Sequence, residues 1–216
     1  MRKITALRVG KGRVKRVNVF LDGKCTFSLE AEVAVKDGLR VGQELSTSQI
    51  EVLARSDHFH RCRNAAVQYL SYRPRSEFEL RERLHRRGFD DDSVEAVLTK
   101  LKEQGLVDDM AFAQFWKDNR ESFSPRSQWL TKMELRQKGV TGAVVDQMVN
   151  AIDDGDSAYR AAQSRVRSLP LGDYHGFRRQ LGEYLKRRGF GYRVINHTVE
   201  RLWQERVGRD LDSTLP

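Results

Sequence analysis

The residue types that could carry catalysis or bind a metal are few in this chain of 216 residues. His58, His60 and Cys62 stand close together, but a metal site needs several converging ligands and alternate positions of a helix diverge. Nothing elsewhere completes such a set, so we interpret this segment as a polar linker. Gly10 and Gly12 lack the Gly-Lys-Ser/Thr ending of a phosphate loop, and no catalytic triad or carboxylate pair is recognisable. We expect that the protein is not an enzyme and that it binds no metal ion and no cofactor.

Basic residues are the stronger candidates for chemistry. The chain carries 39 Lys/Arg against 30 Asp/Glu, a formal net charge of +9. The surplus is uneven: the net charge is +5 for residues 1–56, −1 for residues 57–155 and +7 for residues 156–209. An anionic partner is therefore expected, which could be nucleic acid, an acidic protein groove or a membrane surface.

The candidate partner-binding residues are basic side chains at predicted helix ends and in the loops that enter predicted helices. They are Arg73, Arg75, Arg86, Arg87, Arg126, Arg136, Lys138, Arg178, Arg179, Lys186, Arg187, Arg188 and Arg193. Those at helix ends could instead only complement the helix dipole, which contributes about 0.3–1 kcal/mol each. Both interpretations stay open for the first two clusters, whereas the surplus around residues 178–193 favours binding.

An internal repeat of about fifty residues positions these clusters. Pro74-Arg75-Ser76 and Pro125-Arg126-Ser127 open two copies, 51 positions apart. Gly88, Gly139 and Gly189 each stand four residues after a leucine. Each also comes directly after a short segment rich in basic residues. This pattern is typical of a helix that buries its leucine and ends at a glycine in the left-handed conformation.

Each copy is expected to contain three helices, of which the first are predicted at residues 61–72, 110–123 and 157–169. Ser76 to Glu79 predicts a capping box. The segments Asp90 to Asp92 and Asp108-Asp109 are expected to cap the helices that follow them. The aromatic residues within the predicted helices are expected in the core rather than at a stacking surface. They are Phe112, Phe115, Trp116, Trp129 and Trp203.

The N-terminal segment predicts a small β-rich lobe. Strands are expected near residues 4–9, 17–21 and 25–29, with Asp22-Gly23 as a hairpin turn that needs positive φ at both positions. Such a lobe is too small for a strong core of its own, so we expect it to pack on the helices that follow.

The predicted fold class is mainly α, with three tandem three-helix repeats in an elongated array after the β-rich lobe. The expected divisions are the lobe, the three repeats and a C-terminal tail, at residues 1–48, 49–107, 108–155, 156–209 and 210–216. Two lone cysteines, no signal-peptide pattern and no apolar run near the ~20 residues of a membrane span predict a soluble cytoplasmic protein. We expect a monomer.

The repeated segments resemble the RecX family of regulatory proteins. The resemblance covers about residues 60–205, and its first copy carries the most specific residues. The third copy has His175-Gly176-Phe177 where the others have Pro-Arg-Ser, so its entry loop is expected to differ. The residues that carry the resemblance are Tyr69 to Ser76, Glu79-Leu80, Arg86 to Phe89, Lys102 to Asp109, Phe112-Ala113, Glu134 to Val140 and Leu185 to Phe190.

The resemblance implies a non-catalytic inhibitor of the RecA recombinase, with a place in DNA repair, homologous recombination and the SOS response. Members of the family bind the RecA–DNA filament, lie along its groove and inhibit its ATPase, strand-exchange and coprotease activities. It also implies weaker binding to DNA, which we expect to be single-stranded.

Two other functions remain open. The chain could be a stand-alone DNA-binding protein, because three-helix units resemble helix-turn-helix folds and the charge is suitable. It could also be a scaffold for an unrelated acidic protein. The recurrence of similar units in one chain, rather than one dominant recognition helix, favours the RecA regulator.

The helix-ending glycines lead to a first prediction. Gly88→Val should lower the free energy of unfolding by more than ~1 kcal/mol, because a β-branched residue does not easily adopt positive φ. The same change at Gly139 and Gly189 should behave alike if the repeats are real. Thermal unfolding measures this, and an unchanged midpoint for Gly88→Val would contradict a helix stop at that residue.

Overall fold

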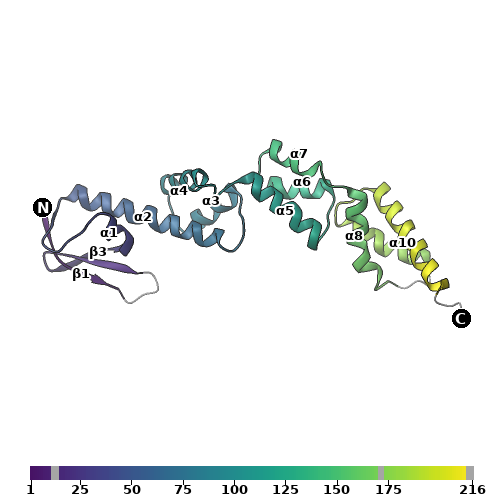
Figure 1. The fold of residues 1–216 in the computed structure, drawn as a ribbon, viewed down its shortest axis with the longest axis horizontal. Coiled ribbons are helices and arrows are strands. Elements are labelled where there is room, and N and C mark those ends of the chain that lie inside the picture. Colours follow the sequence, from purple (N-terminus) through teal and green to yellow (C-terminus); the bar gives the residue numbers. More distant parts are fainter. Residues whose placement is uncertain (11–14, 170–172, 213–216) are drawn as a thin grey trace. The chain divides into compact units, whose positions relative to one another are not determined.

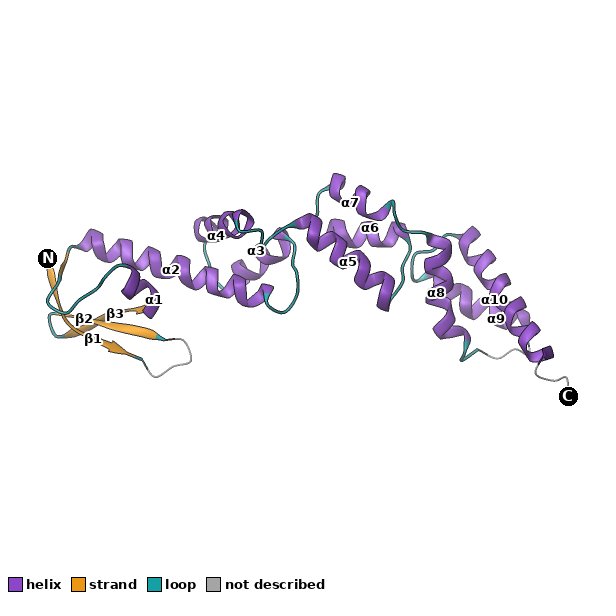
Figure 2. Ribbon diagram, viewed as in Figure 1, coloured by secondary structure: helices purple, strands orange, loops and turns teal. Residues whose placement is uncertain are grey.

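A computed structural model describes residues 1–10, 15–169 and 173–212 of the chain. The chain divides into two compact units. The first comprises residues 1–75 and 80–107, and the second comprises residues 76–79 and 108–216. Gly12 and the last four residues of the predicted tail lie outside the described residues. The structure is mainly α, with its strands confined to the N-terminal part, as predicted (Figure 2).

The N-terminal part of the first unit is a four-stranded sheet in the order β3-β2-β1-β4, with antiparallel pairing throughout. Its strands are β1 (Arg2–Val9), β2 (Arg16–Leu21), β3 (Lys24–Glu30) and β4 (Glu44–Leu45). Asp22 and Gly23 both have positive φ, which confirms the predicted hairpin turn between β2 and β3. Alternate residues of β2 are buried, because successive side chains point to opposite faces of a sheet.

Two short elements of this sheet region were missed in the sequence. They are the helix α1 (Ala31–Lys36) and the strand β4. Neither spans enough residues to show a period, so their residues carry no pattern from which to predict them. Val33 of α1 and Leu45 of β4 are both buried in the core of the lobe.

A single long helix, α2 (Thr47–Leu70), connects the lobe to the first helical core (Figure 1). The sequence predicted its start near residue 61, but it begins fourteen residues earlier, where Ser46 and Gln49 form a reciprocal capping box. Asp57 of α2 forms hydrogen bonds with the lobe. Its carboxylate accepts from the backbone N–H of Glu30 at 2.6 Å and from Arg16 at 3.1 Å, which confirms that the lobe packs on the helices.

The interpretation of residues 58–62 as a polar linker is wrong, because they lie inside α2. Cys62 is fully buried in the core between α2, α3 (Glu77–Arg86) and α4 (Asp91–Glu103), and His58 pairs with Asp90 at 2.8 Å. Polar and apolar residues alternate in this segment, and that pattern does not indicate a helix. The helix is nevertheless present, and it is buried on one side only. The described residues contain no group of three or more His, Cys, Asp or Glu placed to hold a metal ion.

Six helices follow in the second unit, after the first turn of α3. Two hydrophobic clusters lie within them, one among the first three helices around Phe112 and Leu135, and one among the last three around Phe177 and Leu181. The division into four domains and a tail stays a prediction. The helices are α5 (Asp109–Phe123), α6 (Gln128–Gln137), α7 (Gly142–Val149), α8 (Asp154–Val166), α9 (Tyr174–Lys186) and α10 (Tyr192–Asp212).

The predicted N-caps are present. The Asp90 carboxylate accepts from the backbone N–H of Ser93, and Asp108 accepts from the N–H groups of Met110 and Ala111. Ser76 accepts from the backbone N–H of Glu79 at 3.1 Å, which is one of the two hydrogen bonds of the capping box predicted at the start of α3. These caps satisfy N–H groups that have no partner within the helix itself.

Two helix ends in the second unit meet a neighbouring helix at a glycine. Gly139 follows α6 with a φ of +77°, and a Cβ there would overlap Phe78 in the first turn of α3. Gly189 follows α9 with a φ of +83°, and its Cβ would lie 2.6 Å from Ser127 Oγ and 2.8 Å from the Cβ of Leu130. Only a residue without a side chain allows these two close approaches.

Hydrogen bonds repeat at the two contacts. Ser76 Oγ donates to the carbonyl of Lys138 at 2.6 Å, and the backbone N–H of Ser127 donates to the carbonyl of Arg188 at 3.0 Å. We call α2–α4, α5–α7 and α8–α10 the first, second and third helix triplets. An aspartate of the next triplet also holds each neighbouring helix start, since Glu77 N donates to Asp109 and Gln128 N donates to Asp154. The fifty-residue repeat therefore brings equivalent residues into contact, although the donor to the carbonyl is a hydroxyl at Ser76 and a backbone N–H at Ser127.

The third copy departs from this pattern at its entry, as the sequence predicted. The helix α9 begins at Tyr174, four residues earlier than the repeat spacing from Gln128 would place it. Asp173 caps it by accepting from the N–H groups of His175 and Gly176. The added turn comprises residues 174–177, and Arg178 follows it within α9.

One aromatic residue is wrongly predicted. Trp129 is 62% exposed, because its position near the start of α6 faces Gly189 rather than the core. Phe112 is fully buried, whereas Phe115, Trp116 and Trp203 are partly buried. No helix within the described ranges is long and apolar enough to cross a membrane.

The glycine contacts change the first prediction. All three glycines have positive φ, which confirms the helix stops, but no atom of the described residues lies within 4 Å of a Cβ at Gly88. Gly88→Ala should therefore cost about 1–2 kcal/mol of strain alone. Gly139→Ala and Gly189→Ala should cost about 1–3 kcal/mol more, because the added Cβ displaces packed atoms. Urea unfolding of the three variants tests this order, and equal losses would contradict it.

A thiol assay tests the burial of Cys62. Burial raises the pKa of this thiol to about 12, so it stays protonated and shielded below that pH. At pH 8 the native protein should react with Ellman's reagent at Cys25 only, which is exposed, and the unfolded protein at both cysteines. The Cys25→Ser variant is the control. Rapid reaction of that native variant would show that Cys62 is accessible.

Candidate nucleic-acid and partner interface

The structure gives several of the candidate cations a contact inside the fold. Arg75 is buried, and its Nε donates to the carbonyl of Tyr69 at 3.0 Å. Lys138 pairs with Glu79 at 2.5 Å, next to the close approach at Gly139. These side chains hold helices together, a role that the sequence pattern did not reveal.

Arg126 and Arg188 also have contacts within the second unit. Arg126 pairs with Glu134 of α6. Arg188 donates to Ser124 Oγ at 3.2 Å, and its guanidinium lies 4.4 Å from the ring centre of Tyr184. Neither side chain extends freely into solvent, although both are only half-buried.

Three of the candidates line one groove between α9 and α10. Arg178, Arg179 and Lys186 are all exposed. Arg179 and Lys186 lie on the same face of α9 because seven positions are close to two helical turns, and Arg178 is adjacent to Arg179. The groove has a volume of about 370 Å³. The added turn of α9 comprises residues 174–177 and supplies His175 to the groove, so the altered entry of the third copy contributes one residue to this surface.

Tyr192 forms the opposite wall of the groove and is 72% exposed. Arg178 lies 3.4 Å from both the Tyr192 hydroxyl and Asn196 Oδ1. A hydrogen bond with Asn196 and the charge of Arg178 lower the pKa of the Tyr192 phenol below its usual value. The groove thus combines guanidinium groups, an ammonium group and an exposed aromatic ring. Glu183 is the one acidic residue among its described lining residues.

A smaller basic hollow lies in the first unit. Arg86 and Arg87 line it together with Tyr69 and Arg83, and its volume is about 310 Å³. The guanidinium of Arg83 lies 5.5 Å from the ring centre of Tyr69. Sequence reasoning missed Arg83, although it stands one helical turn before Arg87.

The remaining candidates lie outside both hollows. Arg136, Arg187 and Arg193 are exposed, and Arg73 is half-buried with its guanidinium donating to the carbonyl of Pro74 at 2.7 Å. A surface of this composition can bind anionic oxygens, because guanidinium groups match phosphate and carboxylate geometry and exposed aromatic rings can stack on bases.

Comparison with known proteins identifies the relationship. Residues 2–46 match the family description "Regulatory protein RecX N-terminal domain", and residues 62–101 match "RecX, first three-helix domain". A regulatory protein RecX of Clostridium botulinum is 32% identical over 206 residues, which cover 93% of this chain and 96% of the relative. The regulatory protein RecX of Clostridium perfringens is 29% identical over 207 residues, covering 94% and 97%.

Solved structures agree with the sequence comparison. A crystal structure of regulatory protein RecX superposes with a TM-score of 0.66 at 25% identity, covering 93% of this chain and all of that one. RecX from Lactobacillus salivarius shares the fold with a TM-score of 0.57 at 21% identity, covering 68% and 97%. The match to the Clostridium botulinum protein at 32% identity covers 93% of this chain, and the chain therefore belongs to the RecX family of regulatory proteins.

Proposed function

We propose that this protein is a negative regulator of the RecA recombinase. It binds the RecA–DNA filament and inhibits the ATPase, strand-exchange and coprotease activities of RecA. Membership in the RecX family supports a regulatory role. The observation that carries the binding proposal is the exposed groove of α9 and α10, where Arg178, Arg179 and Lys186 face solvent together.

The charge of this groove suits a filament on DNA. Such a filament presents phosphates and acidic protein surface, and residues 156–209 carry a net charge of +7. Of the initial candidates, the eight exposed ones are retained for partner binding, while those held inside the fold contribute mainly to stability. The eight are Arg86, Arg87, Arg136, Arg178, Arg179, Lys186, Arg187 and Arg193.

We further propose that the chain acts as a monomer of one lobe and three helix triplets, with no catalysis of its own. Its two cysteines are free, which supports a reducing compartment such as the cytoplasm. Weaker binding to single-stranded DNA is part of the same proposal, since phosphates and bases suit the groove.

RecA ATPase assays on single-stranded DNA test the proposal directly. The protein should depress ATP turnover by RecA and should hydrolyse no ATP alone. Pull-down experiments should retain it on RecA–DNA filaments more strongly than on RecA alone or DNA alone. Full RecA activity at saturating concentrations of this protein would refute the proposed regulation.

Charge reversal in the groove tests the interface. Arg179→Glu/Lys186→Glu should raise the concentration needed for half-inhibition at least about tenfold, equivalent to about 1.4 kcal/mol. The difference from the wild type should shrink as salt rises, because exposed charges are screened over about 8 Å at physiological ionic strength. Arg188 is left intact because its contact with Ser124 would confound a stability effect with a binding effect.

The matched control is Arg165→Glu/Arg167→Glu, which makes the same charge change on exposed residues of the third triplet outside the groove. Its inhibition of RecA should remain close to that of the wild type. If both double variants lose inhibition equally, net charge rather than the groove drives binding. If the groove variant inhibits normally and only melts at a lower temperature, the groove is not the interface.

A stand-alone DNA-binding protein remains the second candidate, favoured by the pairing of Arg178 with the exposed Tyr192. Anisotropy with a labelled single-stranded oligonucleotide separates the two. Binding to bare DNA as tight as to the filament, with no effect on RecA turnover, would support this alternative.

A further inference from the structure

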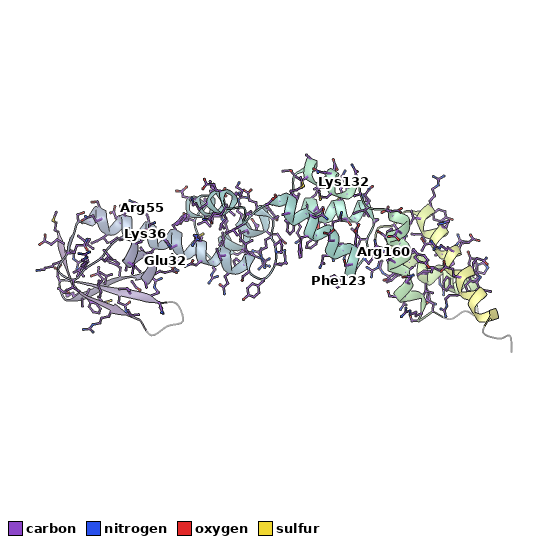
Figure 3. The ribbon with its side chains drawn as sticks, viewed as in Figure 1. Glu32, Lys36, Arg55, Phe123, Lys132 and Arg160 are labelled. Atoms are coloured by element: carbon purple, nitrogen blue, oxygen red, sulfur yellow. The ribbon has the colours of Figure 1, made fainter. Side chains whose placement is uncertain are left out.

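Two arginines pair with one carboxylate in the second unit, and a third arginine lies close enough for its charge to act on both. Arg120 comes from α5, Arg126 from the loop before α6, and Arg188 from the end of α9. The carboxylate is Glu134 of α6, whose side chain is only 11% exposed. Figure 3 marks this region by Phe123 at the end of α5 and Arg160 on α8, and Arg160 donates to the carbonyl of Glu121 at 2.9 Å.

Glu134 cannot neutralise the whole cluster. Its Oε2 accepts from Trp116 Nε1 and from Arg120 Nε, both at 2.8 Å, and its Oε1 accepts from Arg126. Arg188 bonds to the neutral hydroxyl of Ser124 instead. The three guanidinium groups and one carboxylate leave two positive charges without a partner of opposite sign within the cluster.

The burial of polar atoms and charges in this cluster is not fully compensated by contacts within the described residues. The Nε atoms of Arg126 and Arg188 are buried without a hydrogen-bond partner among the described residues. Burial lowers the pKa of Arg120 and Arg126, and the charge of Arg188 lowers both further. Partly desolvated like charges repel one another, so this arrangement favours the entry of an anion.

We propose that Arg120, Arg126 and Arg188 form a binding site for a phosphate oxyanion, separate from the groove of α9 and α10. A guanidinium offers five donors in a planar fork, and each of these arginines uses one of them in a hydrogen bond to a described side chain. A tetrahedral oxyanion presents several acceptors at once. Because Arg188 comes from the third helix triplet and the other two arginines from the second, the bound anion would join the two triplets.

The oxyanion could be free phosphate or a phosphodiester of nucleic acid, which share this chemistry. Thermal unfolding of the full chain in sodium phosphate and in sodium chloride, at equal pH and ionic strength, tests binding. Phosphate at about ten times its dissociation constant should raise the melting temperature by about 3–6 °C. Arg188→Gln should abolish the difference between the two salts, whatever its melting temperature in chloride.

Arg165→Gln is the matched control, since Arg165 also donates to a serine hydroxyl, that of Ser168, but lies on α8 away from the cluster. This variant should keep the full response to phosphate. No response in the wild type, or an equal response in both variants, would overturn the site.

Nuclear magnetic resonance of the wild-type protein gives a readout that does not depend on a variant folding. Titration with inorganic phosphate should shift the Nε–Hε signals of Arg126 and Arg188 and leave that of Arg165 in place. Shifts spread evenly over exposed arginines would show only weak surface association and would contradict a built site.

A phosphodiester source is tested with a labelled oligothymidylate. If the site takes nucleic-acid phosphate, Arg188→Gln should lower the slope of log affinity against log salt by about 0.7, the value for one phosphate of a single strand, and phosphate should compete. If the slope is unchanged while the phosphate response persists, the ligand is free phosphate. Neither measurement involves RecA. Failure of the regulator proposal would therefore not contradict this site, and failure of this site would not contradict the regulator proposal.

Discussion

The close approach of a helix start to a helix-ending glycine is the contact on which the second unit depends. At Gly139 and Gly189 the backbone turns into the left-handed region, and the absence of a side chain lets Phe78 or Ser127 pack against it. Hydrogen bonds from the same helix starts to the carbonyls of Lys138 and Arg188 hold the contact. At each contact a single glycine thus both ends one helix and leaves room for the neighbouring helix to pack.

This contact sorts the basic residues of the repeat into different roles. Arg87, Lys138 and Arg188 each stand directly before a glycine and look equivalent in the sequence. Arg87 is exposed, since nothing in the described residues packs on Gly88. Lys138 and Arg188 are half-buried, and they bond to Glu79 and Ser124 across the contacts. The position in the repeat is the same, but the presence of a neighbouring helix decides whether the cation is free for a partner.

The third triplet shows how a departure from the repeat can generate a binding surface. Replacement of the Pro-Arg-Ser entry lets α9 start one turn earlier under an aspartate cap. That turn adds His175 to the groove that Arg178, Arg179 and Lys186 line, and α10 supplies Tyr192 on the other side. Rigid helices hold these charges in place, so less conformational entropy is lost when an anion binds than with a flexible loop.

The sequence alone was sufficient to predict three of the four strands and the hairpin turn of the lobe, the period of the repeat, the aspartate caps of α4 and α5 and the helix stops, because these depend on residues close together in the chain. It was also sufficient to place the family. It could not reveal the start of α2 or the exposure of Trp129, since those depend on which surface a distant segment covers. Nor could it separate Arg126 and Arg188 from the exposed arginines. Their neighbours, Glu134 and Ser124, come near only when α5, α6 and α9 pack together, so only the tertiary structure decided which charges face solvent and which share a carboxylate.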